Sequence, residues 1–304
     1  MGNDLFKSAD LKGVRNAMAE CVRDLGWLAV VGPVGVGKST SVRAALGEMR
    51  GVRVVEPVAL DRERVRIGHI LEAAIDDLCD NERPRQSMEA RSRQWRRIVG
   101  TAGQRERIVL LIEEAHRLHR STLVALKGVR EIGWAGRCPI VAVVLVGQVD
   151  LEARLRRTRE VRLRVKRHTM SGLTKSEVGD YVTKHLGYKV APVALKEIAL
   201  RCREPLGVAD VCSQARDWAD ARRHPGITVE DVRSALGIEH NVSERIKRSG
   251  LPMQEVARRA GVSKSAVSAV ANGTYAGRTA MVDRIAEVLE QEEGGTAKAK
   301  RQTA

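Results

Sequence analysis

A nine-residue segment, GPVGVGKST, constrains the fold of this chain more than any other part of the sequence. It spans residues 32–40 and fits the pattern G-x-x-x-x-G-K-[ST]. The aliphatic run WLAVV precedes it and a helical pattern follows it, which is the strand–loop–helix context that the motif requires. Glycines let such a loop turn its N–H groups inward, and the helix presents its positive N-terminus to the same anion. The sequence therefore predicts a phosphate-binding loop.

The residues of this loop have separate predicted roles. Lys38 is expected to reach the β and γ phosphates of a nucleotide, and Ser39 to supply a hydroxyl ligand to Mg²⁺. A chance glycine-rich turn is the alternative, and the strand–helix context disfavours it. The predicted nucleotide-binding residues are Gly32, Pro33, Val34, Gly35, Val36, Gly37, Lys38, Ser39 and Thr40.

Strands alternate with helical patterns through the first half of the chain. Continuous apolar runs at 108–112 and 140–146 are typical of strands that are buried on both faces. The alternating side chains of Val161, Leu163 and Val165 predict the last strand. This alternation predicts an α/β domain whose parallel sheet is covered by helices on both sides.

Two acids, Glu113 and Glu114, follow the strand predicted at 108–112. A P-loop hydrolase needs an acid for its metal and a group that positions water, both at the end of a buried strand. Glu113 stands where aspartate is usual, and its extra methylene leaves slow hydrolysis open. Glu114 is the candidate for polarising water. A solvated helix start is the alternative, and the five preceding apolar residues disfavour it.

The strand predicted at 140–146 is followed by Gly147 and Gln148. This order places an amide beside the other strand ends, where it can sense the γ phosphate. A common Gly-Gln turn is the alternative interpretation of the same pair.

The β pattern ends after residue 170, and amphipathic segments predict a helical domain over 171–238. A helix-turn-helix is predicted within 239–292, where Gly261 can adopt the positive φ of the turn and Ser263 can cap the second helix. Residues 293–304 are basic and lack large apolar side chains, which predicts a disordered tail.

The charge of the chain favours a polyanionic partner. It has 53 Lys and Arg against 38 Asp and Glu, a net charge of +15. The second helix of the helix-turn-helix lacks the Arg, Gln or Asn that make bidentate base contacts, so we expect phosphate contacts to double-stranded DNA with little sequence preference. A protein-docking module is the alternative. The predicted DNA contacts on this helix are Ser263, Lys264, Ser265 and Ser268.

Several classes of protein are disfavoured by what the sequence lacks. Its longest apolar run, 140–146, is too short to span a bilayer, and its start shows no secretion signal. The five cysteines form no CxxC pair, so we expect a reducing, cytoplasmic location and no zinc site.

Together GPVGVGKST, LLIEEAH and VLVGQ resemble the AAA+ ATPases, in particular their DNA-transposition and ExeA-like group. The resemblance covers roughly residues 11–236. It implies a P-loop AAA+ domain over 1–170, a helical lid over 171–238, and a slow ATPase with ATP and Mg²⁺ as cofactors. It also implies a homo-oligomer or helical filament, because an arginine finger acts on the nucleotide of a neighbouring subunit.

Further site residues are implied by position within this resemblance. Gln148 is the expected sensor 1, and Lys127 and Arg130 are expected to grip DNA. Arg201 or Arg203 is the expected sensor 2, although the usual Gly-x-Pro-Arg order is absent. The arginine finger is expected among Arg154, Arg156, Arg157 and Arg159, with Arg157 favoured.

The segment 253–290 also resembles the DNA-binding domain of the phage Mu B transposition protein, in a permuted order. The resulting hypothesis is an ATP-dependent, largely non-sequence-specific DNA-binding ATPase that oligomerises on target DNA and recruits or activates a transposase in a bacterial host cell. Two alternatives stay open. A secretion ATPase of the ExeA kind needs a membrane segment, and the longest apolar run here is too short to be one. An ATP-switched transcription regulator needs a helix that reads bases, and the predicted second helix has few side chains for this.

Overall fold

The computed structural model describes residues 5–57, 65–238, 242, 246–247, 249–272, 274–275 and 280–289. The chain divides into two compact units. The first contains Met1–Tyr181 and Ala199–Val208, and the second contains Val182–Ile198 and Ala209–Ala304. The domain boundaries placed after residues 170 and 238 stay predictions, and the predicted tail lies outside the described residues.

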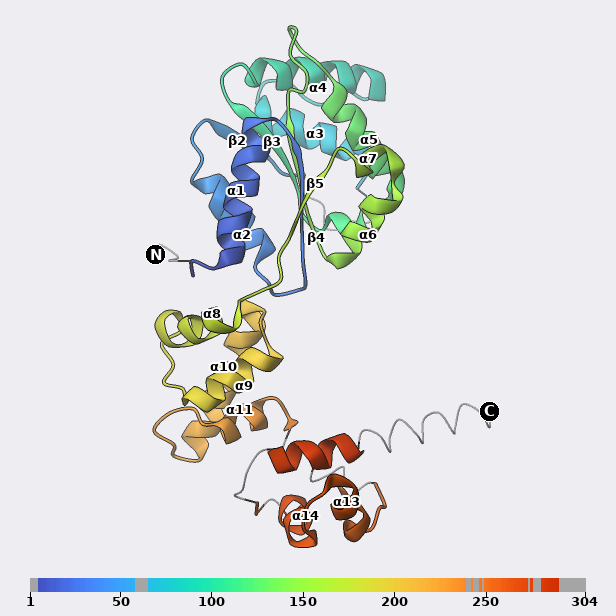
Figure 1. Ribbon diagram of the computed structural model, residues 1–304. Coiled ribbons are helices and arrows are strands. Elements are labelled where there is room, and N and C mark those ends of the chain that lie inside the picture. Colours follow the sequence, from blue (N-terminus) through green and yellow to red (C-terminus); the bar gives the residue numbers. More distant parts are fainter. Residues whose placement is uncertain are drawn as a thin grey trace, which may run out of the picture. The chain divides into compact units, whose positions relative to one another are not determined.

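The first unit is built on a parallel five-stranded sheet in the order β2-β3-β4-β1-β5. This arrangement confirms the predicted α/β fold (Figure 1). The strands are β1 (Trp27–Val31), β2 (Val52–Val55), β3 (Arg107–Ile112), β4 (Ala142–Gly147) and β5 (Lys166–Thr169).

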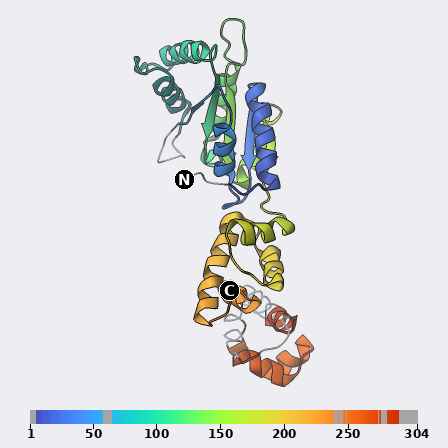
Figure 2. The ribbon, with the colours of Figure 1, turned by 90° about the vertical axis from the view of Figure 1, so that its left-hand side faces the viewer.

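Helices cover both faces of this sheet (Figure 2). Successive strand residues point to opposite faces, so Leu110 and Leu111 of β3 enter two different cores. One core also contains Met18 of α1, and the other contains Ile70 of α3. The helical elements of this unit are α1 (Ala9–Arg23), α2 (Lys38–Gly47), α3 (Ile67–Leu78), α4 (Met88–Ala102), η2 (Ala115–Arg117), α5 (Arg120–Glu131), α6 (Val149–Arg157), α7 (Arg159–Arg162) and α8 (Lys175–Asp180).

The last strand of the sheet differs from its prediction. Val161 lies in the helical turn α7 instead of a strand, and β5 begins only at Lys166. Val161 and Val165 are both buried, but they are four residues apart, a spacing that fits one face of a helix as well as one face of a strand. Leu163 between them is 84% exposed. The spacing of the two valines therefore does not distinguish the two-residue period of a strand from the 3.6-residue period of a helix.

The second unit contains the described part of the helix-turn-helix. Gly261 follows α13 with φ +63°, and the Ser263 hydroxyl accepts a hydrogen bond from the Ala266 N–H at the start of α14, so both predicted turn roles are confirmed. Val256 and Val267 lie in the core of this part. The remaining helices are α9 (Pro192–Arg201) and α10 (Pro205–Ala221), which contribute to both units, α11 (Val229–Ala235), α13 (Met253–Ala260), α14 (Lys264–Ala271) and 280–289. In the described parts of the chain no helix has the length and apolar character needed to cross a membrane.

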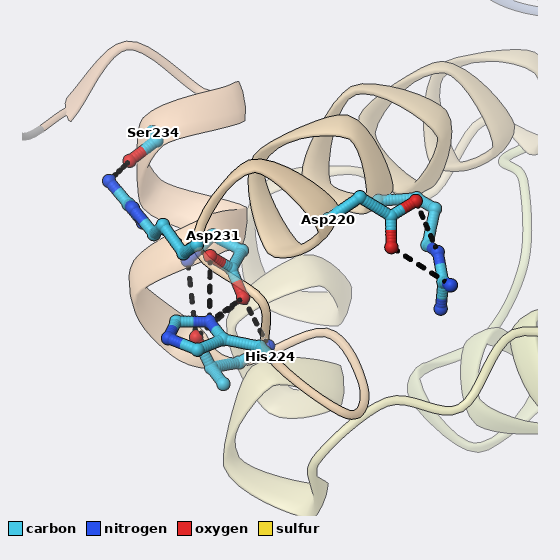
Figure 3. A network of polar contacts seen from close by, with 7 residues as sticks. Asp220, His224, Asp231 and Ser234 are labelled. Carbon is cyan, nitrogen blue, oxygen red and sulfur yellow. Dashed lines mark hydrogen bonds and ion pairs between the residues drawn. The ribbon is translucent and has the colours of Figure 1, made fainter.

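A buried carboxylate organises the start of α11 (Figure 3). Asp231 is fully buried and accepts hydrogen bonds from the Arg222 guanidinium at 3.1 Å and from the Thr228 N–H at 2.9 Å and hydroxyl at 2.7 Å. His224 Nδ1 lies 2.9 Å from the same carboxylate. Burial alone would raise the pKa of Asp231, but the hydrogen bonds from these partners hold it below its usual value.

We expect Asp231→Asn to lower the free energy of unfolding by about 1–3 kcal/mol, because it removes a buried carboxylate oxygen and leaves its hydrogen-bond donors unsatisfied. Urea unfolding of the full chain measures the change. The matched control is Asp220→Asn, whose exposed pair with Arg216 at 2.9 Å should contribute less than about 1 kcal/mol (Figure 3).

The effect of Asp231 should also depend on pH with a defined sign. Because its pKa is held low in the folded chain, its stabilisation is present above the ordinary pKa of aspartate and is lost as the pH falls. The difference between wild type and variant should therefore shrink below about pH 4. Equal stability of the two proteins at pH 7 would contradict the assignment.

Candidate functional site

The predicted phosphate loop connects β1 to α2 and depends on glycine at defined positions. Gly35 and Gly37 have φ of +79° and +89°, a region that strains other residues. At Gly32 a Cβ atom would lie 2.6 Å from the Met170 carbonyl oxygen, so only glycine lets the loop approach the end of β5. Gly37 is the N-cap of α2 and offers no side chain to its first N–H groups. These groups are therefore oriented for an external anion.

Lys38 is folded beneath the loop. Its Nζ donates hydrogen bonds to the carbonyl oxygens of Gly32 at 3.0 Å and Pro33 at 2.7 Å. Burial lowers the pKa of Lys38, while the nearby charges of Glu114 and Glu113 act in the opposite direction. The ammonium group is thus fixed at the loop where a phosphate group would bind.

The two predicted metal ligands are in direct contact. The Ser39 hydroxyl donates a hydrogen bond to Glu113 Oε2 at 2.8 Å. Glu113 is 7% exposed, burial raises its pKa, and its Oε1 has no hydrogen-bond donor among the described residues. Arg43 lies 3.7 Å from that oxygen. A hydroxyl and one carboxylate suit Mg²⁺, which takes few protein ligands and completes its shell with phosphates and water.

Strand register explains how distant predicted residues reach the same edge of the sheet. Val31 pairs with Gly147, and Ile112 pairs with Leu145, so the residues after β1, β3 and β4 all emerge at the carboxyl edge. Gln148 begins α6 there as its N-cap residue, and its side chain makes no capping bond. The predicted loop, acids and sensor amide therefore share one edge.

Glu114 has an unusual backbone conformation. Its φ is +52°, which is uncommon for a residue with a Cβ and costs about 1–3 kcal/mol. Its carboxylate is 43% exposed, with Oε2 3.7 Å from His116 Nε2 and 3.8 Å from Arg117 Nε. A strained, accessible carboxylate beside a buried one fits a group that contacts water and substrate.

His116 is a site residue that the sequence analysis missed. Its Nδ1 accepts a hydrogen bond from the Gln148 N–H at 3.4 Å, and burial lowers its pKa. A neutral ring that accepts at Nδ1 carries its proton on Nε2, the atom nearest Glu114. The carbonyl oxygen of His116 also accepts a hydrogen bond from Arg154. His116 therefore lies between Glu114, the predicted water-positioning acid, and Gln148, the predicted sensor 1 residue.

The structure distinguishes among the candidate arginine fingers. Arg154 donates to carbonyl oxygens at His116 and Leu118, and Arg156 pairs with Glu152 at 2.6 Å. Arg157 and Arg159 are exposed and have no ion-pair partner in the described part of the chain. Arg157 and Arg159 are thus both accessible candidates, and Arg157 stays the prediction favoured from the sequence.

Part of the predicted lid, the segment Ala199–Val208, contacts the phosphate loop within the first unit. The Leu206 N–H donates to the Gly35 carbonyl oxygen at 3.2 Å. Arg203, a predicted sensor 2 residue, instead donates its Nε to the Leu173 carbonyl oxygen at 2.7 Å. Asp10 accepts from the N–H groups of Ser171 and Gly172 at 2.9 and 2.8 Å. Neither Asp10 nor Leu206 belongs to a motif, so no sequence signal predicts these two contacts.

The predicted DNA contacts lie in different environments. Ser263, Lys264 and Ser265 are exposed at the start of α14, whereas Ser268 is half-buried. Lys127 lies 3.8 Å from Glu131. Arg130 is half-buried, and its Nε is enclosed without a hydrogen-bond partner among the described residues. Ser263, Lys264 and Ser265 are therefore more accessible than the pair on α5.

Comparisons with known proteins agree with this architecture. Residues 22–155 match the family model of the AAA domain, and residues 242–293 match that of a helix-turn-helix. No curated protein sequence matches the chain.

Two of the solved structures that this chain resembles are archaeal proteins. CDC6P from Pyrobaculum aerophilum superposes with a TM-score of 0.58 at 16% identity, covering 93% of this chain and 85% of that chain. The ORC2 protein of Aeropyrum pernix, in ADPNP–ADP complexes, gives a TM-score of 0.53 at 12% identity, covering 93% and 81%. At these identities the likeness shows the fold alone. The chain therefore combines an AAA domain, with a P-loop beside a parallel sheet, and a C-terminal helix-turn-helix domain.

Proposed function

We propose that this chain is an ATPase that binds DNA in an ATP-dependent and largely sequence-independent manner. One observation carries the proposal: the Ser39–Glu113 contact at 2.8 Å lies at a P-loop, in a chain that also has a helix-turn-helix domain. The Aeropyrum pernix ORC2 structure contains ADPNP and ADP, and we propose an adenine nucleotide for this P-loop as well.

Within this proposal each residue of the edge has a role. The backbone N–H groups of the loop over 34–40 and the Lys38 ammonium bind the phosphates, and Ser39 and Glu113 hold Mg²⁺. Glu114 orients the attacking water, and Gln148 contacts the γ phosphate. When bound, ATP would supply the transferable phosphoryl group, and Mg²⁺ would neutralise the negative charge of the phosphates. Arg157 of a neighbouring copy completes the site, so hydrolysis requires an oligomer.

The DNA interface proposed on α14 makes contacts to phosphates. The side chains of Ser263, Lys264 and Ser265 are exposed at a helix N-terminus. Their hydroxyl and ammonium groups can donate hydrogen bonds to phosphate oxygens of the DNA backbone. Lys127 and Arg130 of α5 stay predicted contacts, and Ser268 stays the innermost candidate of α14. The net charge of +15 supports binding of a polyanion.

We further propose that the oligomer is a filament on target DNA that recruits or activates a transposase. The support is the resemblance of LLIEEAH and VLVGQ to the DNA-transposition group. Electron microscopy of the full chain with random duplex DNA, with and without ATP, tests the assembly. Ordered filaments that require both ATP and DNA would support it, and their absence under both conditions would contradict it.

Replacing Lys264 by glutamine tests the proposed phosphate contact. Comparing two unrelated duplexes in the same titrations distinguishes this proposal from a transcription regulator. One phosphate contact contributes about 0.9 to the slope of log affinity against log salt, so the slope should fall by about 0.9 for every duplex. DNA titrations at several salt concentrations on two unrelated duplexes measure it. Affinities that differ between the duplexes by several orders of magnitude would favour the regulator instead.

A further inference from the structure

A concave site unrelated to the P-loop lies at the amino edge of the sheet. A cavity of about 770 Å³ is lined there by residues within two positions of a strand start, including Gly51 before β2 and Ile140 before β4. Its other walls come from the α4–β3 turn and from the loop between α5 and β4, which projects beyond the sheet at the top of Figures 1 and 2. The P-loop, in contrast, follows the carboxyl end of β1.

The loop between α5 and β4 is held in a defined conformation. Trp134 and Arg137 exchange backbone hydrogen bonds at 2.8 and 2.9 Å. The Trp134 ring packs on Gly100, where a Cβ atom would lie 2.2 Å from the ring. Arg96 stacks over the same ring, 5.7 Å from its centre, and donates its Nε to the Gly133 carbonyl oxygen at 2.7 Å. The loop is therefore positioned before any partner binds.

Three arginines line this cavity, and we call them the arginine cleft: Arg105, Arg107 and Arg137. All three are exposed, and within the described ranges none of their guanidinium groups has a carboxylate partner. By contrast, Arg97 on nearby α4 pairs with Glu82. Glu106 is the one acid that lines the cavity among these described residues. The cleft thus presents three cations against one acid, and none of the three forms an ion pair within the described ranges.

We propose that the arginine cleft binds the phosphate backbone of duplex DNA. The proposal rests on the DNA-binding function proposed above and assigns part of that function to the AAA domain. Guanidinium groups match phosphate oxygens in a bidentate fork and are the side chains best suited to this contact. The cleft reads no bases, because its donors come from a turn, a loop and the first residue of β3, and none of them lies on a helix that could enter a groove.

The net charge and the neighbouring domain favour DNA over an acidic protein as the occupant. A chain of charge +15 with a helix-turn-helix already attracts a polyanion whose phosphates repeat at regular spacing. A second contact surface on the same subunit lets each copy in an oligomer hold the backbone at two places. Affinity then depends on phosphates that are neutralised in every subunit.

The test compares two triple variants of the full chain. The first is Arg105→Gln, Arg107→Gln and Arg137→Gln. The control removes the same charge at exposed positions outside the cleft, with Lys12→Gln, Arg93→Gln and Arg120→Gln. The slope of log affinity for random duplex DNA against log salt should fall by up to about 2.7 in the cleft variant, or 0.9 per lost phosphate contact. The control should keep most of the wild-type slope.

The affinity for a fluorescent ATP analogue should be equal in wild type and in both variants. This measurement is the control that the AAA domain of each variant is folded. A cleft variant that binds ATP normally and retains the wild-type slope would overturn the inference while the proposed function stands. Equal losses in the cleft and control variants would overturn it too, because general charge would then explain the binding. Wild type that binds no DNA would overturn the proposed function itself.

Discussion

Replacing Lys38 by alanine is expected to abolish ATP binding, and ATP-dependent DNA binding with it. The variant removes the cation that lies against the loop and leaves the carbonyl oxygens of Gly32 and Pro33 without their donor. Both effects act at the phosphate site, because a charge-assisted contact is lost and the loop loses its internal support. We expect ATP affinity to fall by at least about 100-fold, since hydrogen bonds to charged groups contribute about 1.5–3 kcal/mol each.

Titration with a fluorescent ATP analogue measures this loss, and DNA binding with and without ATP is measured on the same preparation. Lys12→Ala is the control, because Lys12 is an exposed lysine of α1 outside the loop. Thermal unfolding of both variants checks that the fold is intact. Unchanged ATP affinity in a folded Lys38 variant would refute the assignment of residues 32–40.

Replacing Glu114 by glutamine should leave ATP binding intact and slow hydrolysis by about 10²–10⁴-fold. The substitution keeps the size of the side chain but removes the carboxylate that orients water. The buried Ser39–Glu113 contact is unaffected, so Mg²⁺ and nucleotide should still bind. DNA complexes formed with ATP should therefore last longer than those of the wild type.

Single-turnover phosphate release and ATP affinity, measured separately, distinguish the two acids. Glu113→Gln replaces a buried carboxylate whose Oε2 accepts from Ser39, and it should weaken binding of Mg²⁺ and ATP. If Glu113→Gln retains ATP and blocks hydrolysis while Glu114→Gln has no effect, the two roles are reversed.

The parts of the site that could be predicted from sequence are those in which a local motif fixes the geometry. Glycine at 35 and 37 allows the positive φ that the loop requires, so the motif itself specifies its backbone. The buried strand β3 likewise carries Glu113 to the sheet edge through its continuous apolar run. In both cases the signal lies within a few residues.

The features that escaped prediction depend on contacts between distant segments. His116 acquires its role from Gln148, which is 32 residues away and reaches it only because β3 and β4 are neighbours. Arg130 is expected from the resemblance to grip DNA, yet its Nε is enclosed once α5 packs. β5 could not be located by alternation, because Val161 and Val165 fit two periods. Tertiary packing decides such cases.

The two carbonyl hydrogen bonds of Lys38 have a thermodynamic consequence for any ligand of the loop. A free lysine side chain loses about 1.5–2 kcal/mol of rotamer entropy when it becomes ordered. Here Gly32 and Pro33 hold the ammonium, so this loss belongs to the folding of the chain and not to ligand association. An arriving phosphate meets a preorganised cation, so the lysine's contribution to the affinity reflects an exchange of acceptors and not the ordering of its side chain.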